Sequence, residues 1–116
     1  METPESLPLV KGTVELLVLK SLTWGPRHGF GISAWVEEQS RGALAIDDSA
    51  MYQVLHRLES REHVAAEWRL TENNRRARYY RLTAAGRLYL RRETETWIRS
   101  SGLVTSVLTL PARPAS

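Results

Sequence analysis

The sequence contains no cysteine, which excludes disulfides, thiolate metal sites and cysteine nucleophiles and is compatible with a cytoplasmic protein. It also lacks any apolar run of about 18 residues, so no membrane span is expected. The first ten residues, METPESLPLV, have no basic segment ahead of a long apolar core and are not expected to be a secretory signal. A glycine-rich phosphate loop, a nucleophile elbow, paired catalytic carboxylates and a zinc-protease motif are all missing. The sequence therefore gives no support to an enzyme, and no cofactor is expected.

Lysine is missing from the second half of the chain, where arginine carries the positive charge. Residues 61–116 contain 11 Arg against 5 acidic residues, whereas residues 1–60 contain 5 Lys+Arg against 8 acidic residues. Between Arg69 and Arg92, eight arginines accompany a single acidic residue, Glu72. A one-sided basic segment is typical of nucleic-acid-binding proteins and, less often, of proteins that bind anionic membrane surfaces. The preference for arginine favours geometric recognition of phosphates or bases over simple charge attraction.

The composition suits one folded domain. A length of 116 residues allows a hydrophobic core, and 42% hydrophobic with 25% charged residues argues against disorder. Residues 1–10 hold two prolines and are expected to form a loose arm.

Two helices are predicted next. The first covers residues 12–23 with Thr13 as its cap, and the glycine- and proline-rich segment 24–31 then turns the chain. The second covers about residues 30–40 and ends at Gly42. Their expected buried residues are Val14, Leu17, Val18, Leu22, Ile32, Trp35 and Val36.

A third helix is predicted in residues 49–63, SAMYQVLHRLESREH, after a short expected strand at residues 43–46. Asp47, Asp48 and Ser49 are alternative N-caps for it. Its apolar stripe consists of Met51, Val54, Leu55 and Leu58, at the spacing of an amphipathic helix. Its outer face and flanks carry Ser49, Tyr52, Gln53, His56, Arg57 and Ser60. A solvated face usually alternates Glu and Lys, whereas amide, imidazole, hydroxyl and guanidinium groups are those that read base edges and hold phosphates.

A β-hairpin is predicted directly after this helix. Residues 64–70 alternate with period two, residues 71–76 form a polar turn, and residues 77–83 form a second strand rich in aromatic residues. The expected inward residues are Val64, Ala66, Trp68, Leu70, Tyr80 and Leu82. Three short helices followed by a two-stranded ribbon make a winged helix-turn-helix, a mainly α fold with a small β-wing. The arginines of the hairpin, Arg75, Arg76 and Arg78, are either a solvated tip or a wing that lies on the phosphate backbone.

A long last helix begins at Ala84 and is expected to end at Pro111, with Gly102 as a place where it could kink. A heptad-like seam runs along it through Leu90, Thr94, Trp97, Ser101, Val104 and Leu108. This stripe extends beyond what a small domain can cover. The expected partner is the same helix of a second copy, related by a two-fold axis.

Four segments of the chain resemble the PadR-type winged-helix transcriptional regulators. These segments are KGTVELLVLKSL (11–22), HGFGI (28–32), SAMYQVLHRLE (49–59) and RARYYRLTAAGR (76–87). The resemblance implies a dimeric repressor whose C-terminal helices form the dimer. It further implies that the third helices and wings bind an inverted-repeat operator on double-stranded DNA. The length resembles the compact branch of the family, which has a single dimerisation helix.

Two positions depart from the family pattern. The family usually has Pro where this chain has Gln53, and it usually has Gly near the position of Glu62 or His63. Gln53 faces outward on the third helix and is expected to extend base reading. The missing Gly removes the easiest left-handed C-cap and leaves the corner between helix and wing less well defined.

The predicted organisation is an arm at 1–10, a winged helix-turn-helix DNA-binding domain at 11–83, a dimerisation helix at 84–110 and a tail at 111–116. The candidate DNA-binding residues are Ser49, Tyr52, Gln53, His56, Arg57, Asn73, Asn74, Arg75, Arg76 and Arg78. The candidate dimerisation residues are Leu90, Thr94, Trp97, Val104 and Leu108.

Three alternatives bear on single sites. In some members of the family, an aromatic residue on the dimer helix lines a pore that accepts flat aromatic compounds, and Trp97 resembles that position. The alternative is that Trp97 packs across the dimer interface, since an aromatic residue at helical spacing is far more often a core residue than part of a ligand site. His56, Glu59 and His63 have a spacing that metal ligands can have, but no acid cluster completes a site, so no metal is expected. The alternative function is a winged-helix adaptor that docks a protein, which the arginine-rich hairpin disfavours.

Overall fold

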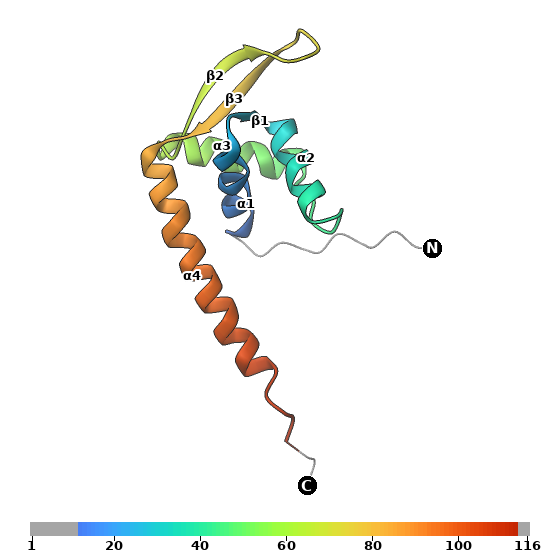
Figure 1. Ribbon diagram of the computed structural model, residues 1–116, viewed down its shortest axis with the longest axis vertical. Coiled ribbons are helices and arrows are strands. Elements are labelled where there is room, and N and C mark those ends of the chain that lie inside the picture. Colours follow the sequence, from blue (N-terminus) through green and yellow to red (C-terminus); the bar gives the residue numbers. More distant parts are fainter. Residues whose placement is uncertain (1–11, 114–116) are drawn as a thin grey trace, which may run out of the picture.

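The computed structural model describes residues 12–113, which form three short helices, a small sheet and one long C-terminal helix (Figure 1). This arrangement confirms the predicted winged helix-turn-helix with a long C-terminal helix. The predicted arm at 1–10 lies outside the described residues. The elements are α1 (Thr13–Ser21), η1 (Leu22–Trp24), β1 (Arg27–His28), α2 (Gly29–Gln39), α3 (Asp48–Ser60), β2 (Val64–Leu70), β3 (Arg76–Leu82) and α4 (Ala84–Leu108).

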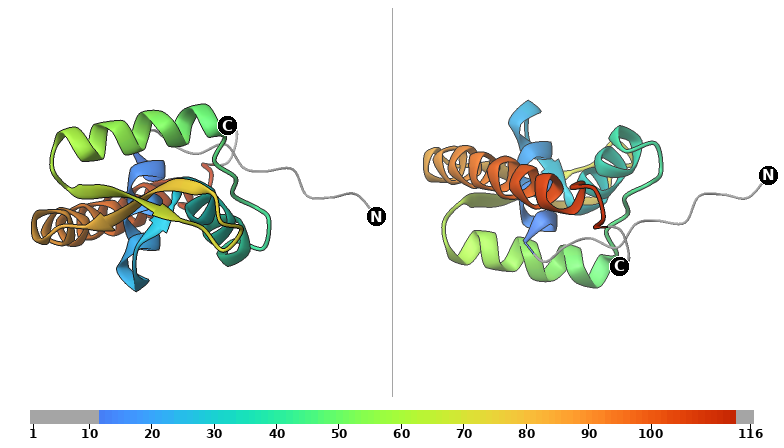
Figure 2. Two further views of the ribbon diagram at one scale, coloured as in Figure 1. Left: turned by 90° about the horizontal axis from the view of Figure 1, so that it is seen from above. Right: turned by 90° about the horizontal axis from the view of Figure 1, so that it is seen from below.

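The hydrophobic core lies where the three short helices meet the base of the sheet. The wing extends beyond this core at one end, and α4 leaves the base of the wing and runs away from the domain (Figure 1). α3 lies along one side of the domain, clear of α4 (Figure 2). The buried hydrophobic residues are Val18, Leu19, Leu22, Ile32, Val36, Ile46, Met51, Val54, Leu55, Leu58, Val64, Leu82 and Leu90.

Helix α3 confirms the predicted third helix, but it ends at Ser60, and residues 61–63 form the turn to β2 instead of continuing the helix. Asp47 caps it, because its carboxylate accepts a hydrogen bond from the Ala50 N–H at 2.7 Å. The four residues of the predicted apolar stripe are all buried. At the other end, Glu62 adopts a left-handed conformation with φ 61°, which closes the corner to β2 without the usual glycine.

The sheet differs from the prediction. Residues 43–46 do not form a strand, although Ile46 is buried in the core. The third strand is instead β1, whose Arg27 and His28 pair with Tyr80 and Tyr79 of β3. Arg27 also donates its Nε–H to the Ser21 carbonyl at 2.9 Å. The described sheet therefore has the order β1-β3-β2, with β3 in the centre.

The prediction for the inward face of β2 is correct only near the core. Val64 pairs with Leu82, and both are buried. Farther out, Trp68 is 59% exposed and Leu70 is 62% exposed, so the prediction that they are buried is wrong. The alternation of the sequence identifies one face of the strand, but the core covers only the first part of that face.

Helices α1 and α2 begin differently from the prediction. Thr13 is the first helical residue of α1 and does not cap it; the cap position is Gly12, with φ 92°. α2 begins at Gly29 because the His28 Nδ1 accepts a hydrogen bond from the Gly31 N–H at 2.9 Å.

Helix α4 is continuous from Ala84 to Leu108, and it passes through Gly102 without a break (Figure 1). Thr83 caps it by accepting a hydrogen bond from the Gly86 N–H at 3.0 Å. The helix ends at Leu108, before Pro111. Within the described residues, no helix has the length and apolar character needed to cross a membrane.

Candidate nucleic-acid interface

The outward face of α3 is fully accessible. All five candidate residues on it are exposed: Ser49, Tyr52, Gln53, His56 and Arg57. The rings of Tyr52 and His56, one helical turn apart, are stacked with centroids 6.3 Å apart and planes at 12°. The face therefore presents exposed hydrogen-bonding groups of several kinds on one side of a helix.

Arg57 differs from its neighbours because it also turns toward α1. Its Nη2 lies 3.9 Å from Oε2 of Glu15, and Nη1 of Arg61 lies 3.5 Å from Oε1 of the same carboxylate. The Glu15 side chain is 9% exposed, whereas both guanidinium side chains are about half exposed. The carboxylate thus ties the end of α3 to α1, and Arg57 keeps one side open to solvent.

Glu15 is also close to α4. Burial raises the pKa of the Tyr89 hydroxyl, and the neighbouring Glu15 carboxylate raises it further. The His63 ring stacks on Tyr89 with centroids 4.2 Å apart. Sequence analysis missed Glu15, although its spacing from Val18, Leu19 and Leu22 places it on the buried stripe of α1.

The wing turn is held by hydrogen bonds between its backbone groups and by the Thr71 hydroxyl, which accepts from the Arg75 N–H at 3.2 Å. The Thr71 N–H donates to the Arg75 carbonyl at 2.8 Å, and the Asn74 N–H donates to the Thr71 carbonyl at 2.9 Å. Asn74 has φ 59°, in the left-handed region that Asn tolerates. The candidate wing residues Asn73, Asn74, Arg75 and Arg76 are all exposed.

Arg78 joins the wing to α3. Its Nη2 donates to Oε2 of Glu59 at 2.6 Å, and the two residues are 19 positions apart in the chain. Nearby, burial raises the pKa of the Tyr80 hydroxyl; the charge of Arg78 opposes this shift, and the charge of Glu59 adds to it. This ion pair places the base of the wing beside the end of α3, so the two candidate DNA-binding elements are linked.

Helix α4 leaves the apolar residues of its outer half uncovered. Trp97 is 48% exposed, Val104 57% and Leu108 77%, and Thr94 is also exposed. Leu90 is only 9% exposed, because it packs into the core of its own domain. Leu90 also lines the cavity between α1 and α4, so its predicted contact with a partner would have to be made through that cavity.

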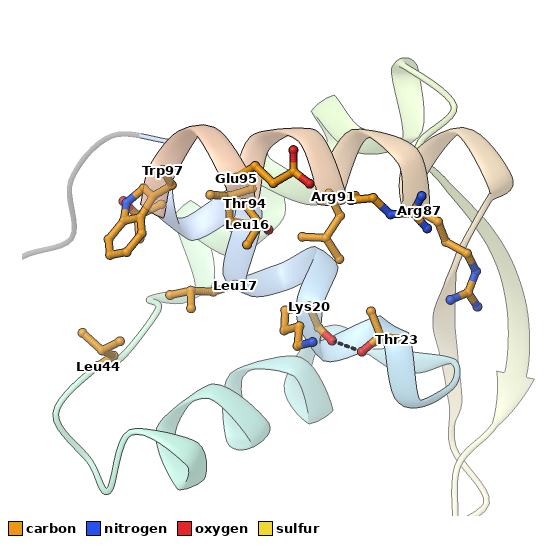
Figure 3. Close-up of a pocket in the computed structure, with 12 residues that line it drawn as sticks. Leu16, Leu17, Lys20, Thr23, Leu44, Arg87, Arg91, Thr94, Glu95 and Trp97 are labelled. Atoms are coloured by element: carbon orange, nitrogen blue, oxygen red, sulfur yellow. Dashed lines mark hydrogen bonds between the residues drawn. The ribbon is translucent and has the colours of Figure 1, made fainter. Parts of the chain in front are cut away.

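A cavity of about 670 Å³ opens between α1 and α4 (Figure 3). Leu16 and Leu17 of α1 face Trp97 of α4 across it, and Lys20 and Arg91 lie farther along its wall (Figure 3). The remaining residues that line it are Thr13, Thr23, Leu44, Arg87, Leu90, Thr94 and Glu95. The lining is mainly apolar with cationic groups along it, so it suits an apolar side chain or a small apolar ligand.

The structure does not bring together the residues whose spacing suggested a metal site. Among residues 12–113, no three His, Asp or Glu side chains gather closely enough to hold a metal ion. His56 lies exposed on the outer face of α3, whereas His63 stacks on Tyr89.

The arrangement of helices and wing matches a known family of regulators. The model of the PadR-like family of transcriptional regulators matches residues 18–92, which include α2, α3, the whole wing and the start of α4. The chain belongs to the PadR-like family. It is a transcriptional regulator, and its family and structural neighbours are regulators, not enzymes.

Three relatives show the extent of the similarity. A transcriptional regulator from Clostridium thermocellum superimposes with a TM-score of 0.76 at 24% identity, with 83% of this chain and 93% of that chain covered. A PadR-family regulator from Eggerthella lenta has a TM-score of 0.71 at 29% identity, with 87% and 86% covered. An uncharacterized 37.1 kDa protein in a transposon of Streptomyces fradiae is 39% identical over 90 residues, 78% of this chain, but the match spans only 24% of that protein.

Proposed function

We propose that this PadR-family regulator is a sequence-specific DNA-binding repressor that binds an inverted-repeat operator as a homodimer. The observation that carries the proposal is the Arg78–Glu59 ion pair, which joins an arginine-rich wing to a helix with a polar, exposed outer face. Residues 11–83 are the proposed DNA-binding unit and residues 84–110 the dimerisation helix. Such a protein would act at the nucleoid, in the cytoplasm.

In the proposed complex, α3 enters the major groove of the DNA and the wing lies on the DNA phosphate backbone. Gln53 and His56 discriminate bases, because an amide or an imidazole can both donate and accept hydrogen bonds at base edges. The hydroxyl groups of Tyr52 and Ser49 donate hydrogen bonds to phosphate oxygens. The wing contacts the DNA phosphates through Asn73, Asn74, Arg75 and Arg76. The half-exposed Arg57 and Arg78 add positive charge that attracts the phosphates.

The second subunit is proposed to cover the apolar residues of α4. Thr94, Trp97, Val104 and Leu108 lie along this helix, and the cavity beside Trp97 offers an apolar seat for a helix. Apolar side chains exposed in a row on a helix of 25 residues are typical of an interface. A two-fold dimer through α4 would set the distance between the two α3 helices and hence the half-site spacing.

The same cavity supports a small aromatic effector as a second proposal. Trp97 provides a flat wall, and Lys20 and Arg91 would pair with an acidic group on the compound. With a second subunit over it, the cavity would become an enclosed space between the subunits. An effector there could change the spacing of the α3 helices.

The experiment that tests the proposed function is selection of bound sequences from random duplex DNA, with affinities measured by fluorescence anisotropy at two salt concentrations. An enriched inverted repeat with salt-dependent affinity supports the dimeric, sequence-specific regulator. Salt-sensitive binding without sequence preference would mean that the arginines hold the backbone and α3 reads no bases. Absence of binding at low salt would contradict the DNA proposal and favour the protein-interaction adaptor. A promoter–reporter assay with the selected operator then tests the sign of regulation.

A further inference from the structure

One face of the wing is turned toward α3. Residues directly opposite in an antiparallel pair point to the same side of a sheet, so Trp68 shares a face with its partner Arg78, and Leu70 with its partner Arg76. Arg78 bonds to Glu59 of α3 from this face. Trp68 and Leu70 therefore stand on the α3 side of the wing, beyond the end of the core.

This face combines exposed apolar groups with positive charge. Trp68 is 59% exposed and Leu70 is 62% exposed. The Arg76 guanidinium carbon lies 5.0 Å from the centroid of the Trp68 ring, which is within range of a cation–π contact. The stacked guanidinium is oriented by the indole, and stacking leaves its in-plane N–H donors available to an anion.

We infer that Trp68 and Leu70 are DNA-contact residues that pack on the deoxyribose edges of the groove beside the wing, while Arg76 holds the adjacent phosphate. The inference rests on the proposed function and extends it from the wing arginines to an apolar contact. Duplex DNA is the partner chosen because the apolar pair is flanked by Arg75, Arg76 and Arg78, and phosphates alternate with apolar sugars along a DNA strand. Apolar side chains make comparable contacts in minor grooves.

The proposed contact between Trp68 and the deoxyribose predicts how DNA affinity should depend on salt concentration in wing variants. Trp68→Ala in the full chain should weaken binding of the selected operator and of random duplex DNA alike by about tenfold. The slope of log affinity against log salt should change much less than in an arginine variant, because the charge of Arg76 stays on the wing although the indole no longer orients it. Arg75→Ala should instead flatten that slope by about 0.9. The matched control is Trp24→Ala, because Trp24 is 75% exposed but lies at the end of η1, off the wing.

A second measurement guards against a variant that fails to fold. Acrylamide quenching of tryptophan fluorescence is compared with and without operator DNA in the wild type and in Trp68→Phe, which keeps a ring against Arg76. We expect DNA to protect a fraction of the wild-type emission that is missing from Trp68→Phe. Equal DNA protection in both proteins, or a Trp68→Ala variant that folds and binds DNA as tightly as the wild type, overturns the inference. A wild type that binds no DNA contradicts the proposed function itself, so the two failures are distinguishable.

Discussion

Glu15 on α1 and Arg61, just past the end of α3, form an ion pair in which Nη1 lies 3.5 Å from Oε1. The pair is asymmetric, since the Glu15 side chain is 9% exposed and that of Arg61 is 52% exposed. The Glu15 carboxylate is largely desolvated, whereas the Arg61 guanidinium remains about half solvated. Glu15 therefore depends on its partners more than they depend on it.

This asymmetry predicts an unequal double-mutant cycle. Arg61→Ala should destabilise the fold by about 1–2 kcal/mol, because the buried carboxylate would keep only the more distant Arg57 as a cationic partner. In a Glu15→Gln background, the same substitution should cost less than about 0.5 kcal/mol, since no buried charge remains to be compensated. Urea denaturation at one fixed protein concentration measures the four stabilities. Equal costs of Arg61→Ala in both backgrounds would show that the ion pair does not hold the helices together.

The assignment of base reading to α3 and backbone binding to the wing predicts two distinct phenotypes. Gln53→Ala should lower affinity for the selected operator by roughly 1–3 kcal/mol and leave random DNA unaffected. Arg75→Ala should weaken binding to every sequence and flatten the salt slope by about 0.9. Anisotropy titrations on both DNAs at several salt concentrations distinguish them. If Gln53→Ala weakens operator and random DNA equally, Gln53 does not read bases.

Helix α3 was predictable because its signals are local. Its apolar residues repeat with the period of a helix, and Asp47 caps it from the position adjacent to its first residue. The outward position of Gln53 and His56 follows from the same periodicity. Periodicity does not show whether these outward residues read bases or only face water, because that depends on which molecule binds the helix.

The features that sequence analysis missed depend on partners far away in the chain. β1 is only two residues long, and Arg27 is in a strand solely because Tyr80 lies beside it. Trp68 alternates as an inward residue should, but alternation cannot show where the core that would cover it ends. Glu15 occupies a buried helical position as a charged residue, which becomes interpretable only once Arg61 is seen beside it.

The corner between α3 and β2 predicts a stabilising substitution. Glu62 has φ 61°, a conformation that is unfavourable for residues with a Cβ and free of strain for Gly. Glu62→Gly should raise the free energy of unfolding by about 0.5–1 kcal/mol. Glu62→Ala is the control, because it removes the carboxylate but keeps the Cβ. A stabilisation of the same size in Glu62→Ala would assign the effect to lost charge repulsion and contradict the backbone explanation.

Two glycines of α4 predict opposite responses to the same substitution. A Cβ on Gly86 would lie 2.0 Å from the carbonyl oxygen of His63, whereas a Cβ on Gly102 would meet nothing within 4 Å. Gly102→Ala should stabilise the helix by up to about 1 kcal/mol, because Ala has the higher helix propensity. Gly86→Ala must push α4 away from the His63 backbone and disturb the Thr83 N–H bond to the His63 carbonyl, which is 3.2 Å long. We expect a loss of several kcal/mol, on the order of an overpacked core site. Thermal unfolding followed by circular dichroism compares the two variants. A Gly86→Ala protein as stable as the wild type would show that the start of α4 can shift to accommodate the Cβ, and the close approach to His63 would then not constrain the packing.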